Sequence, residues 1–251
     1  MLRSYRISSA VMESHFTGLR MTELYCGLKL NADKSEVLWL GTRQQIAKLS
    51  PADKDLVLST GSLLTSSNAR DLGVAVDENL TFDVHARACS RACFYHLHRI
   101  RQVCRFRDEP ATRELVHVYV TSCLDYCNTL FAKSIVAVRQ RLQHIQNSTA
   151  RVICSQSTYT RATPLLRNVH CLPVEKRIVY KLYVLMFDVK YGSVPAYLAY
   201  LCNVCTDERL RSTSRGDFVI LRTRTRTANS AYIVAAPSAW NALSSELRTI
   251  T

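Results

Sequence analysis

The chain has 251 residues, of which 47% are hydrophobic and 21% charged, so its composition is typical of a folded protein rather than a disordered one. It contains only 7 glycines, and none lies between Gly73 and Gly192, which argues against a collagen, an all-β sandwich or an enzyme built on glycine-rich loops. The formal net charge is +13, and a basic excess of this size favours a polyanionic partner.

The positive charge is distributed unevenly along the chain. Residues 1–80 carry 9 basic and 9 acidic side chains, whereas residues 81–180 carry 15 basic and 6 acidic ones. Arginines make up 25 of the 33 cations, and a guanidinium can pair with two phosphate oxygens or stack on a base. We therefore predict nucleic-acid contact from about residue 81 onward, with a merely arginine-rich surface as the alternative.

The N-terminal third is predicted to mix a helix with short strands. Residues 9–27 have apolar residues at helical spacing, and residues 35–40 are typical of a strand. Residues 57–63 and 69–77 indicate further short strands or hairpins, and residues 77–79 indicate a turn.

From Thr81 onward the hydrophobic period becomes that of an amphipathic helix. Over residues 84–105 the apolar side chains fall on one face; these are Ala86, Cys89, Cys93, Leu97, Ile100 and Cys104. The opposite face carries what we call the basic stripe, which consists of Arg87, Arg91, Phe94, His98, Arg101 and Arg105. No acidic residue within 84–105 interrupts this stripe, although a solvated surface is the simpler interpretation of most such patterns.

More helices are predicted downstream. The second begins at Pro110 and runs through Leu130, and the others cover residues 135–153, 173–192 and 196–201. The tail, 235–247, indicates a last helix capped near Pro237. The basic segment 209–227, which includes Arg222, Arg224 and Arg226, is typical of a strand with one basic edge or of a flexible loop.

Other classes of protein and site find little support. No run is long and apolar enough for a membrane span, and the N-terminus does not have the pattern of a signal peptide, so we expect an intracellular protein of undetermined compartment. The ten cysteines are expected to be small buried hydrophobes in a reducing compartment. Cys202 and Cys205 form one Cys-x-x-Cys without a second pair, so a zinc module is a minor alternative and we predict no metal site.

Several segments carry a family resemblance. Residues 27–41 (GLKLNADKSEVLWLG) and 69–83 (ARDLGVAVDENLTFD) resemble consecutive motifs that follow the catalytic aspartates in reverse transcriptases of non-LTR retrotransposons, the LINE-type elements of the jockey and CR1 kind. Four shorter segments fit the C-terminal region of the same reading frame: 124–128 (LDYCN), 141–147 (RLQHIQN), 172–174 (LPV) and 235–241 (AAPSAWN). Each motif is weak alone, but they occur in order from about residue 19 to the end.

The resemblance implies a role for each part of the chain. Residues 1–80 would be a palm remnant, in which Lys34 matches a lysine near the incoming triphosphate and Leu72 with Gly73 lies in a primer-grip-like hairpin. Residues 81–155 would form a helical thumb-like bundle, and residues 156–251 a C-terminal helical region that includes the basic segment 209–227. The expected fold class is α+β and predominantly helical.

The sequence also departs from the family. The catalytic aspartates would lie upstream of residue 1, and two-metal phosphoryl transfer requires such carboxylates. We therefore expect an inactive fragment of an RNA-directed DNA polymerase that holds no cofactor, whereas the full-length enzyme would use Mg²⁺. Its partners would be a template–primer duplex and the missing palm and fingers. The alternative is a helical scaffold protein whose basic surface is incidental.

Overall fold

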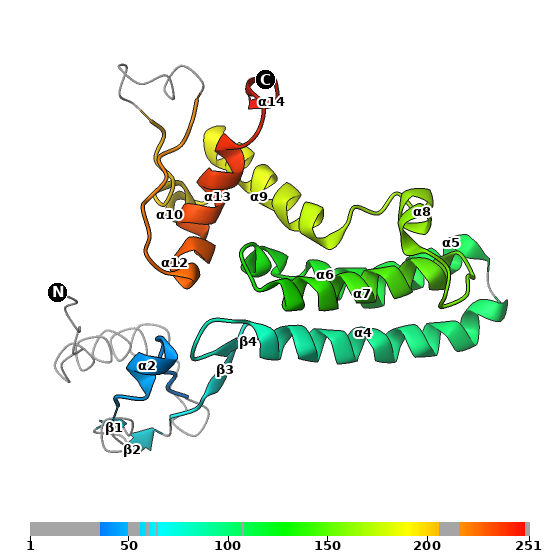
Figure 1. Ribbon diagram of the computed structural model, residues 1–251, viewed down its shortest axis with the longest axis horizontal. Coiled ribbons are helices and arrows are strands. Elements are labelled where there is room, and N and C mark those ends of the chain that lie inside the picture. The colour runs from blue at the N-terminus through cyan, green and yellow to red at the C-terminus, as the bar shows by residue number, and fades with distance from the viewer. Residues whose placement is uncertain are drawn as a thin grey trace, which may run out of the picture. The chain divides into compact units, whose positions relative to one another are not determined.

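The computed structural model describes residues 36–49, 56–58, 61–63, 65–106, 108–205 and 216–248. The predicted helix over 9–27 and the predicted site residue Lys34 lie outside these ranges. The chain divides into two compact units, Met1–Ala69 and Arg70–Thr251. Within the described ranges the fold is α+β and predominantly helical, which confirms the predicted class (Figure 1). None of the helices in this part of the chain is long and apolar enough to cross a lipid bilayer.

The described residues of the first unit include a short helix and a small hairpin. Helix α2 (Arg43–Ile46) begins at a capping box, in which the Thr42 hydroxyl accepts from the Gln45 amide and the Gln45 side chain accepts from the Thr42 amide. Strand β1 (Leu56–Leu58) pairs antiparallel with β2 (Gly61–Leu63), as predicted. The predicted strand over 35–40 is wrong for its described part, because only Val37 forms a bridge, to Thr65, and unpaired backbone does not make a strand.

A second hairpin precedes the long helices. Strands β3 (Asn68–Asp71) and β4 (Val74–Asp77) pair in a two-stranded sheet, which confirms the predicted strands over 69–77. The two loop residues between them, Leu72 and Gly73, have φ of 43° and 86°, and a type I′ turn requires positive φ at both positions. The Tyr126 hydroxyl donates to the Leu72 carbonyl and so ties the loop to the chain beyond α6 (Ser122–Asp125).

Asp77 organises the turn that leads into α4 (Asp83–Val103). Its buried carboxylate accepts from the Thr81 amide at 3.0 Å, the Thr81 hydroxyl at 2.9 Å and the Phe82 amide at 2.7 Å. These hydrogen bonds hold Phe82 in the left-handed region, with φ of 57°, immediately before the helix begins. The predicted turn at 77–79 is confirmed.

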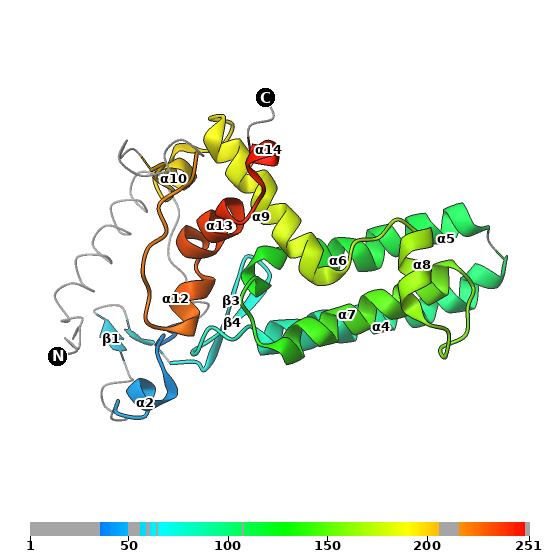
Figure 2. The ribbon, with the colours of Figure 1, turned by 45° about the horizontal axis from the view of Figure 1, so that its top comes forward.

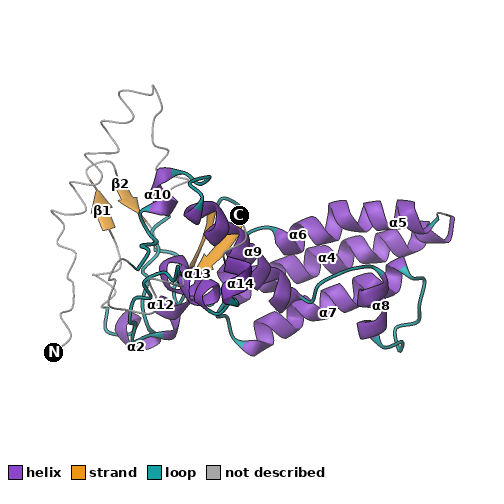
Figure 3. Cartoon of the chain, turned by 90° about the horizontal axis from the view of Figure 1, so that it is seen from above, coloured by secondary structure: helices purple, strands orange, loops and turns teal. Residues whose placement is uncertain are grey.

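A helical bundle forms one end of the second unit (Figures 1 and 3). It consists of α4, of α5 (Glu109–Val116) continued by α6, and of α7 (Val136–Ile153). The five apolar side chains predicted for one face of α4 from Ala86 to Ile100 are all buried, while Cys104 is partly buried. Helices α4 and α7 run in the same direction. The contacts between them show this: the start of α4 contacts the first half of α7, and later residues of α4 contact later residues of α7.

The second helix of the bundle is not continuous, which corrects the prediction of one helix from Pro110 to Leu130. A π-helical turn, His117–Thr121, separates α5 from α6, and such a turn inserts one residue and rotates the following face. Helix α6 ends at Asp125, and Cys127 has a left-handed φ of 50° before a 3-10 turn at Asn128–Phe131. The helical pattern of apolar residues therefore continues past the point where the helix stops.

Polar side chains join the bundle to α9 (Val174–Lys190). On α7, Gln143 accepts from the Val174 amide at 2.9 Å, and Gln146 donates to the Leu172 carbonyl at 2.8 Å. Asp125 accepts two hydrogen bonds from the Arg177 guanidinium. Segments 124–128, 141–147 and 172–174, which carried part of the family resemblance, therefore meet at one junction and hold the start of α9.

A second core lies where α9 meets the C-terminal elements (Figure 2). Its members come from widely separated parts of the chain and are Leu182, Met186, Cys202, Phe218, Ala235, Ala236 and Trp240. Asn241 donates to the Phe218 carbonyl at 2.8 Å and accepts from the Phe218 amide at 2.9 Å. The elements around this core are α10 (Ala196–Ala199), α12 (Arg226–Ser230), α13 (Tyr232–Asn241) and α14 (Ser245–Arg248).

The C-terminal elements differ from their predictions in three places. Pro237 lies inside α13 rather than at its start, because burial of Ala235 and Ala236 against α9 outweighs the local preference of proline for the first turn. Helix α8 (Ala162–Asn168) was not predicted. In the described part of the basic segment 209–227, Arg222 and Arg224 lie in irregular chain rather than in the predicted strand. The segment ends in a helix that was not predicted, because Arg226 begins α12 with the Thr225 hydroxyl as its cap.

Candidate nucleic-acid interface

The basic stripe lies on the exposed face of α4. Arg87, Arg91, His98 and Arg101 are exposed, and Phe94 keeps 36% of its surface accessible. The side chain of Arg105 lies outside the described residues, although its backbone belongs to a 3-10 turn, Cys104–Phe106, that continues α4. Burial of the opposite face against α5 and α7 leaves the stripe free to contact a ligand.

One acidic residue sits at the beginning of the stripe, just outside the window over which the sequence showed none. The Asp83 carboxylate pairs with Arg87 at 2.6 Å and with Arg141 of α7 at 2.7 Å. Arg91 and Arg101 have no acidic partner among the described residues. Exposed ion pairs contribute only about 0–1 kcal/mol, so Arg87 can exchange Asp83 for a phosphate at little cost.

A groove of about 400 Å³ runs between α4 and α7 beside the stripe. Phe94, His98 and Arg101 line it from α4, and His144, Ser148 and Arg151 line it from α7. The Phe94 and His144 rings lie 5.7 Å apart with planes inclined by 49°. The α7 contribution was missed from the sequence, although positions 144, 148 and 151 have the i, i+4, i+7 spacing of one helix face.

The groove combines two kinds of group that bind nucleic acid. The Phe94 and His144 rings offer faces on which a base can stack, and stacking of this kind is indifferent to sequence. Arg101 and Arg151 supply guanidinium groups, although Arg151 Nε already donates to the Thr160 carbonyl at 2.9 Å. Such a surface is suited to contact with the phosphates of a nucleic-acid strand, whose bases or sugars would lie against the Phe94 and His144 rings.

The remaining predicted site residues lie elsewhere. Leu72, whose side chain is 84% exposed, and Gly73 form the tip of the β3–β4 hairpin. Arg222 and Arg224 are exposed in irregular chain before α12, and the side chain of Arg226 lies outside the described residues. No hydrogen bond or ion pair within the described ranges joins Arg222 or Arg224 to α4.

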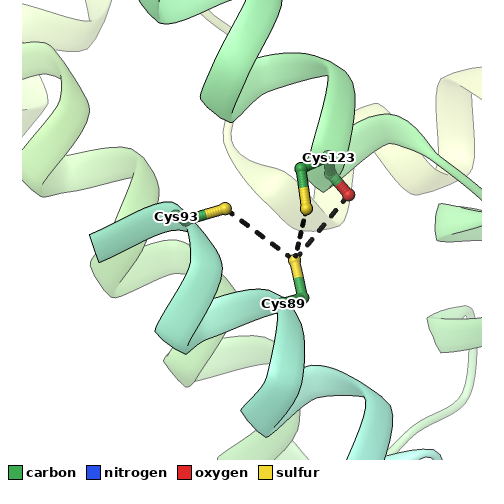
Figure 4. Close-up of side chains that lie close together, drawn as sticks. All are labelled: Cys89, Cys93 and Cys123. Carbon is green, nitrogen blue, oxygen red and sulfur yellow. Dashed lines mark hydrogen bonds between the residues drawn. The ribbon is translucent and has the colours of Figure 1, made fainter. Parts of the chain in front are cut away.

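A separate cluster of thiols lies inside the bundle (Figure 4). Cys89 Sγ is 3.4 Å from Cys123 Sγ and 3.9 Å from Cys93 Sγ. The burial predicted for all the cysteines is confirmed for Cys89, Cys93 and Cys202 but wrong for the other six described cysteines, which are only partly buried. The meeting of Cys89 and Cys93 with Cys123 was not predicted. Hydrogen bonding within the cluster lowers the pKa of the Cys123 thiol and raises the pKa values of Cys89 and Cys93.

Comparison with known proteins finds a distant relative. A probable RNA-directed DNA polymerase from transposon BS of Drosophila melanogaster is 28% identical over 133 residues. The match covers 52% of this chain and 15% of that protein, so the chain spans a small part of its relative. No protein-family model matches the chain, and no solved structure does. The similarity supports a reverse-transcriptase-like relationship.

Proposed function

We propose that the chain is the C-terminal part of a non-LTR retrotransposon reverse transcriptase, of the LINE-type jockey and CR1 kind, and that it binds a template–primer duplex. In this proposal residues 1–80 are the end of the palm, 81–155 the thumb and 156–251 the following region. The relative from transposon BS supports the class of protein, and the ordered motifs support the position within it. The observation that carries duplex binding is the exposed basic stripe beside the α4–α7 groove.

The proposed contact is with the shape of the backbone rather than with the base sequence. Arg91 and Arg101 lie ten residues apart on α4, about 15 Å along a helix axis, so together they reach several phosphates. Phosphate contacts position a duplex and carry little sequence information. The 251 residues contain no adjacent pair of aspartates, so we expect no nucleotide incorporation by this chain alone, with or without Mg²⁺.

A salt titration of duplex binding tests this proposal. Each phosphate contact contributes about 0.9 to the slope of log affinity against log salt for duplex DNA, so Arg91→Ala with Arg101→Ala reduces the slope by about 2. Arg99→Ala is the matched control, because Arg99 is exposed on the same helix but faces α5. Alanine favours helix, so circular dichroism should stay unchanged in all variants. An unchanged slope with intact helicity supports the scaffold alternative instead.

A substitution of Asp83 tests the same proposal through an increase in duplex affinity instead of a decrease. Asp83→Asn removes a negative charge from the stripe and releases both Arg87 and Arg141 from their ion pairs. Duplex affinity and the salt slope should therefore both increase. Glu109→Gln, which releases Arg113 on α5, is the control and should leave duplex binding unchanged. Weaker binding by the Asp83 variant, with normal helicity, would contradict a phosphate-binding role for the stripe.

A further inference from the structure

We propose that Cys89, Cys93 and Cys123 form a three-sulfur binding site for a soft monovalent ion, Cu(I), inside the helical bundle. The three sulfurs lie within 4.8 Å of one another and form the group of potential ligands that the described residues bring together. The proposal is independent of nucleic-acid binding, because the cluster faces the interior and the basic stripe faces solvent.

The spacing of the sulfurs matches what a bound ion requires. Metal–sulfur bonds of about 2.3 Å place sulfurs about 4.0 Å apart around a trigonal centre and about 3.8 Å apart around a tetrahedral one. The observed separations from Cys89 are 3.9 Å to Cys93 and 3.4 Å to Cys123. All three sulfurs lie within 4.8 Å of one another, so binding needs each sulfur–sulfur separation to change by less than about 1 Å. A disulfide, in contrast, needs two sulfurs at about 2.05 Å.

Two local features of the backbone create the cluster. The i, i+4 spacing of Cys89 and Cys93 places both sulfurs on the buried face of α4. Cys123 is the second residue of α6 and follows the π-helical turn, whose extra residue turns the start of α6 toward α4. In Figure 4 the Cys89 and Cys123 sulfurs point toward one another from two different helices.

The donor set favours Cu(I) over Zn²⁺. Thiolates select soft ions such as these, but structural zinc sites are almost always four-coordinate. Among the described residues no fourth cysteine, histidine or carboxylate joins the group. The nearby imidazoles have other neighbours, since His85 stacks on Phe131 and His96 stacks on Tyr119. Cu(I) is stable with two or three sulfur ligands, so the cluster is complete for this ion.

Binding is a ligand exchange without redox change. Each copper–sulfur bond formed with a thiol replaces an S–H bond, and the proton passes to solvent while copper stays Cu(I). The ion then links α4 to α6, two segments separated by the α5 helix and the π-helical turn. An ion that binds the folded state alone stabilises it, so the bundle should melt at a higher temperature when loaded.

The experiment uses the full chain without oxygen, with Cu(I) supplied as its acetonitrile complex and a coloured Cu(I) chelator as competitor. We expect one equivalent of copper that resists the competitor and an upward shift of the melting temperature. X-ray absorption should show about three sulfur neighbours near 2.3 Å. The variant Cys123→Ala should lose at least tenfold in affinity together with the melting shift. The matched control, Cys154→Ala, removes a partly exposed cysteine outside the cluster and should retain both.

Three results overturn the proposal. Equal copper retention by Cys123→Ala and the parent, with both folded by circular dichroism, means that other thiols bind the ion. A Zn²⁺ titration that gives a tighter, four-coordinate complex contradicts the three-sulfur assignment. If reduced chain takes up no copper and air instead produces a Cys89–Cys123 disulfide, the cluster is an oxidisable pair and not an ion site.

Discussion

The two cores of the unit Arg70–Thr251 are built in different ways. The bundle core collects side chains that recur every three or four residues on α4 and α7, with partners from α5, the turns around α6 and the start of α9. The second core joins α9, Cys202, Phe218 and α13, which are far apart in the sequence. A regular amphipathic pattern is sufficient for the first core, whereas the second depends on individual residues that hold irregular chain in place.

The ion pairs of the two regions also differ, in how far their side chains are exposed. The ion pair that joins the bundle to α9, between Asp125 and Arg177, has side chains that are 33% and 23% exposed. The second region contains an ion pair between Asp217 and Arg248, whose side chains are only 9% and 5% exposed. The bundle core is thus built mainly from apolar side chains, whereas the C-terminal region also contains a buried pair of opposite charges.

The largest effect is expected in the bundle core. Leu97 is 3% exposed in the middle of α4, so Leu97→Asp places a charge among apolar side chains and should cost about 4 kcal/mol of unfolding free energy. Urea unfolding followed by circular dichroism measures the loss. Tyr95→Asp, at a 60% exposed position on the same helix, should change stability by less than about 1 kcal/mol. Similar losses in both variants would mean that the face assignment is wrong.

The buried ion pair should give the next largest effect. Arg248→Met removes the buried guanidinium from its ion pair with the Asp217 carboxylate, which should destabilise the protein by about 3 kcal/mol. The double variant Asp217→Asn with Arg248→Met removes both charges and should recover most of this loss. Calorimetric melting of the two variants beside the parent makes the comparison. A double variant less stable than the single one would show that the pair itself is strongly stabilising.

A substitution of Asn241 tests how much its side chain contributes to holding the irregular backbone at Phe218 in the C-terminal core. Asn241→Ala deprives both the amide and the carbonyl of Phe218 of a partner, so we expect a loss of about 2 kcal/mol. Amide hydrogen exchange at Phe218 should become faster in the same variant. Asn229→Ala, at an exposed position in α12, provides the reference and should change stability by at most about 0.5 kcal/mol.

The smallest effect is expected for an exposed ion pair in the bundle. Arg113 and Glu109 lie one turn apart on α5, with side chains 45% and 50% exposed and a separation of 2.8 Å. Arg113→Ala should therefore cost about 0.3 kcal/mol or less, and 1 M salt should abolish the difference. A loss close to that of Arg248→Met would remove the distinction between buried and exposed pairs drawn above.

Much of the bundle could be predicted because helical periodicity is a local signal. The buried face of α4, the opposite stripe and the bounds of α7 follow from apolar spacing alone. The interruption at His117–Thr121 could not, because a π-helical turn has the same composition as the helices around it. The helix from Pro110 was extended too far for the same reason. The α7 side of the groove was missed because its charges are sparse and its partner helix was unknown.

The sequence by itself determined the helical class, the α4 stripe and the reverse-transcriptase-like relationship, because each depends on residue type and spacing within a short window. Only the tertiary structure decided which distant residues meet. The parallel packing of α4 and α7 places His144 beside Phe94, and the turn before α6 brings Cys123 to Cys89. Burial of α13 against α9 places Pro237 inside a helix. These outcomes depend on how faces of separate helices pack, and no local pattern encodes the orientation of one helix relative to another.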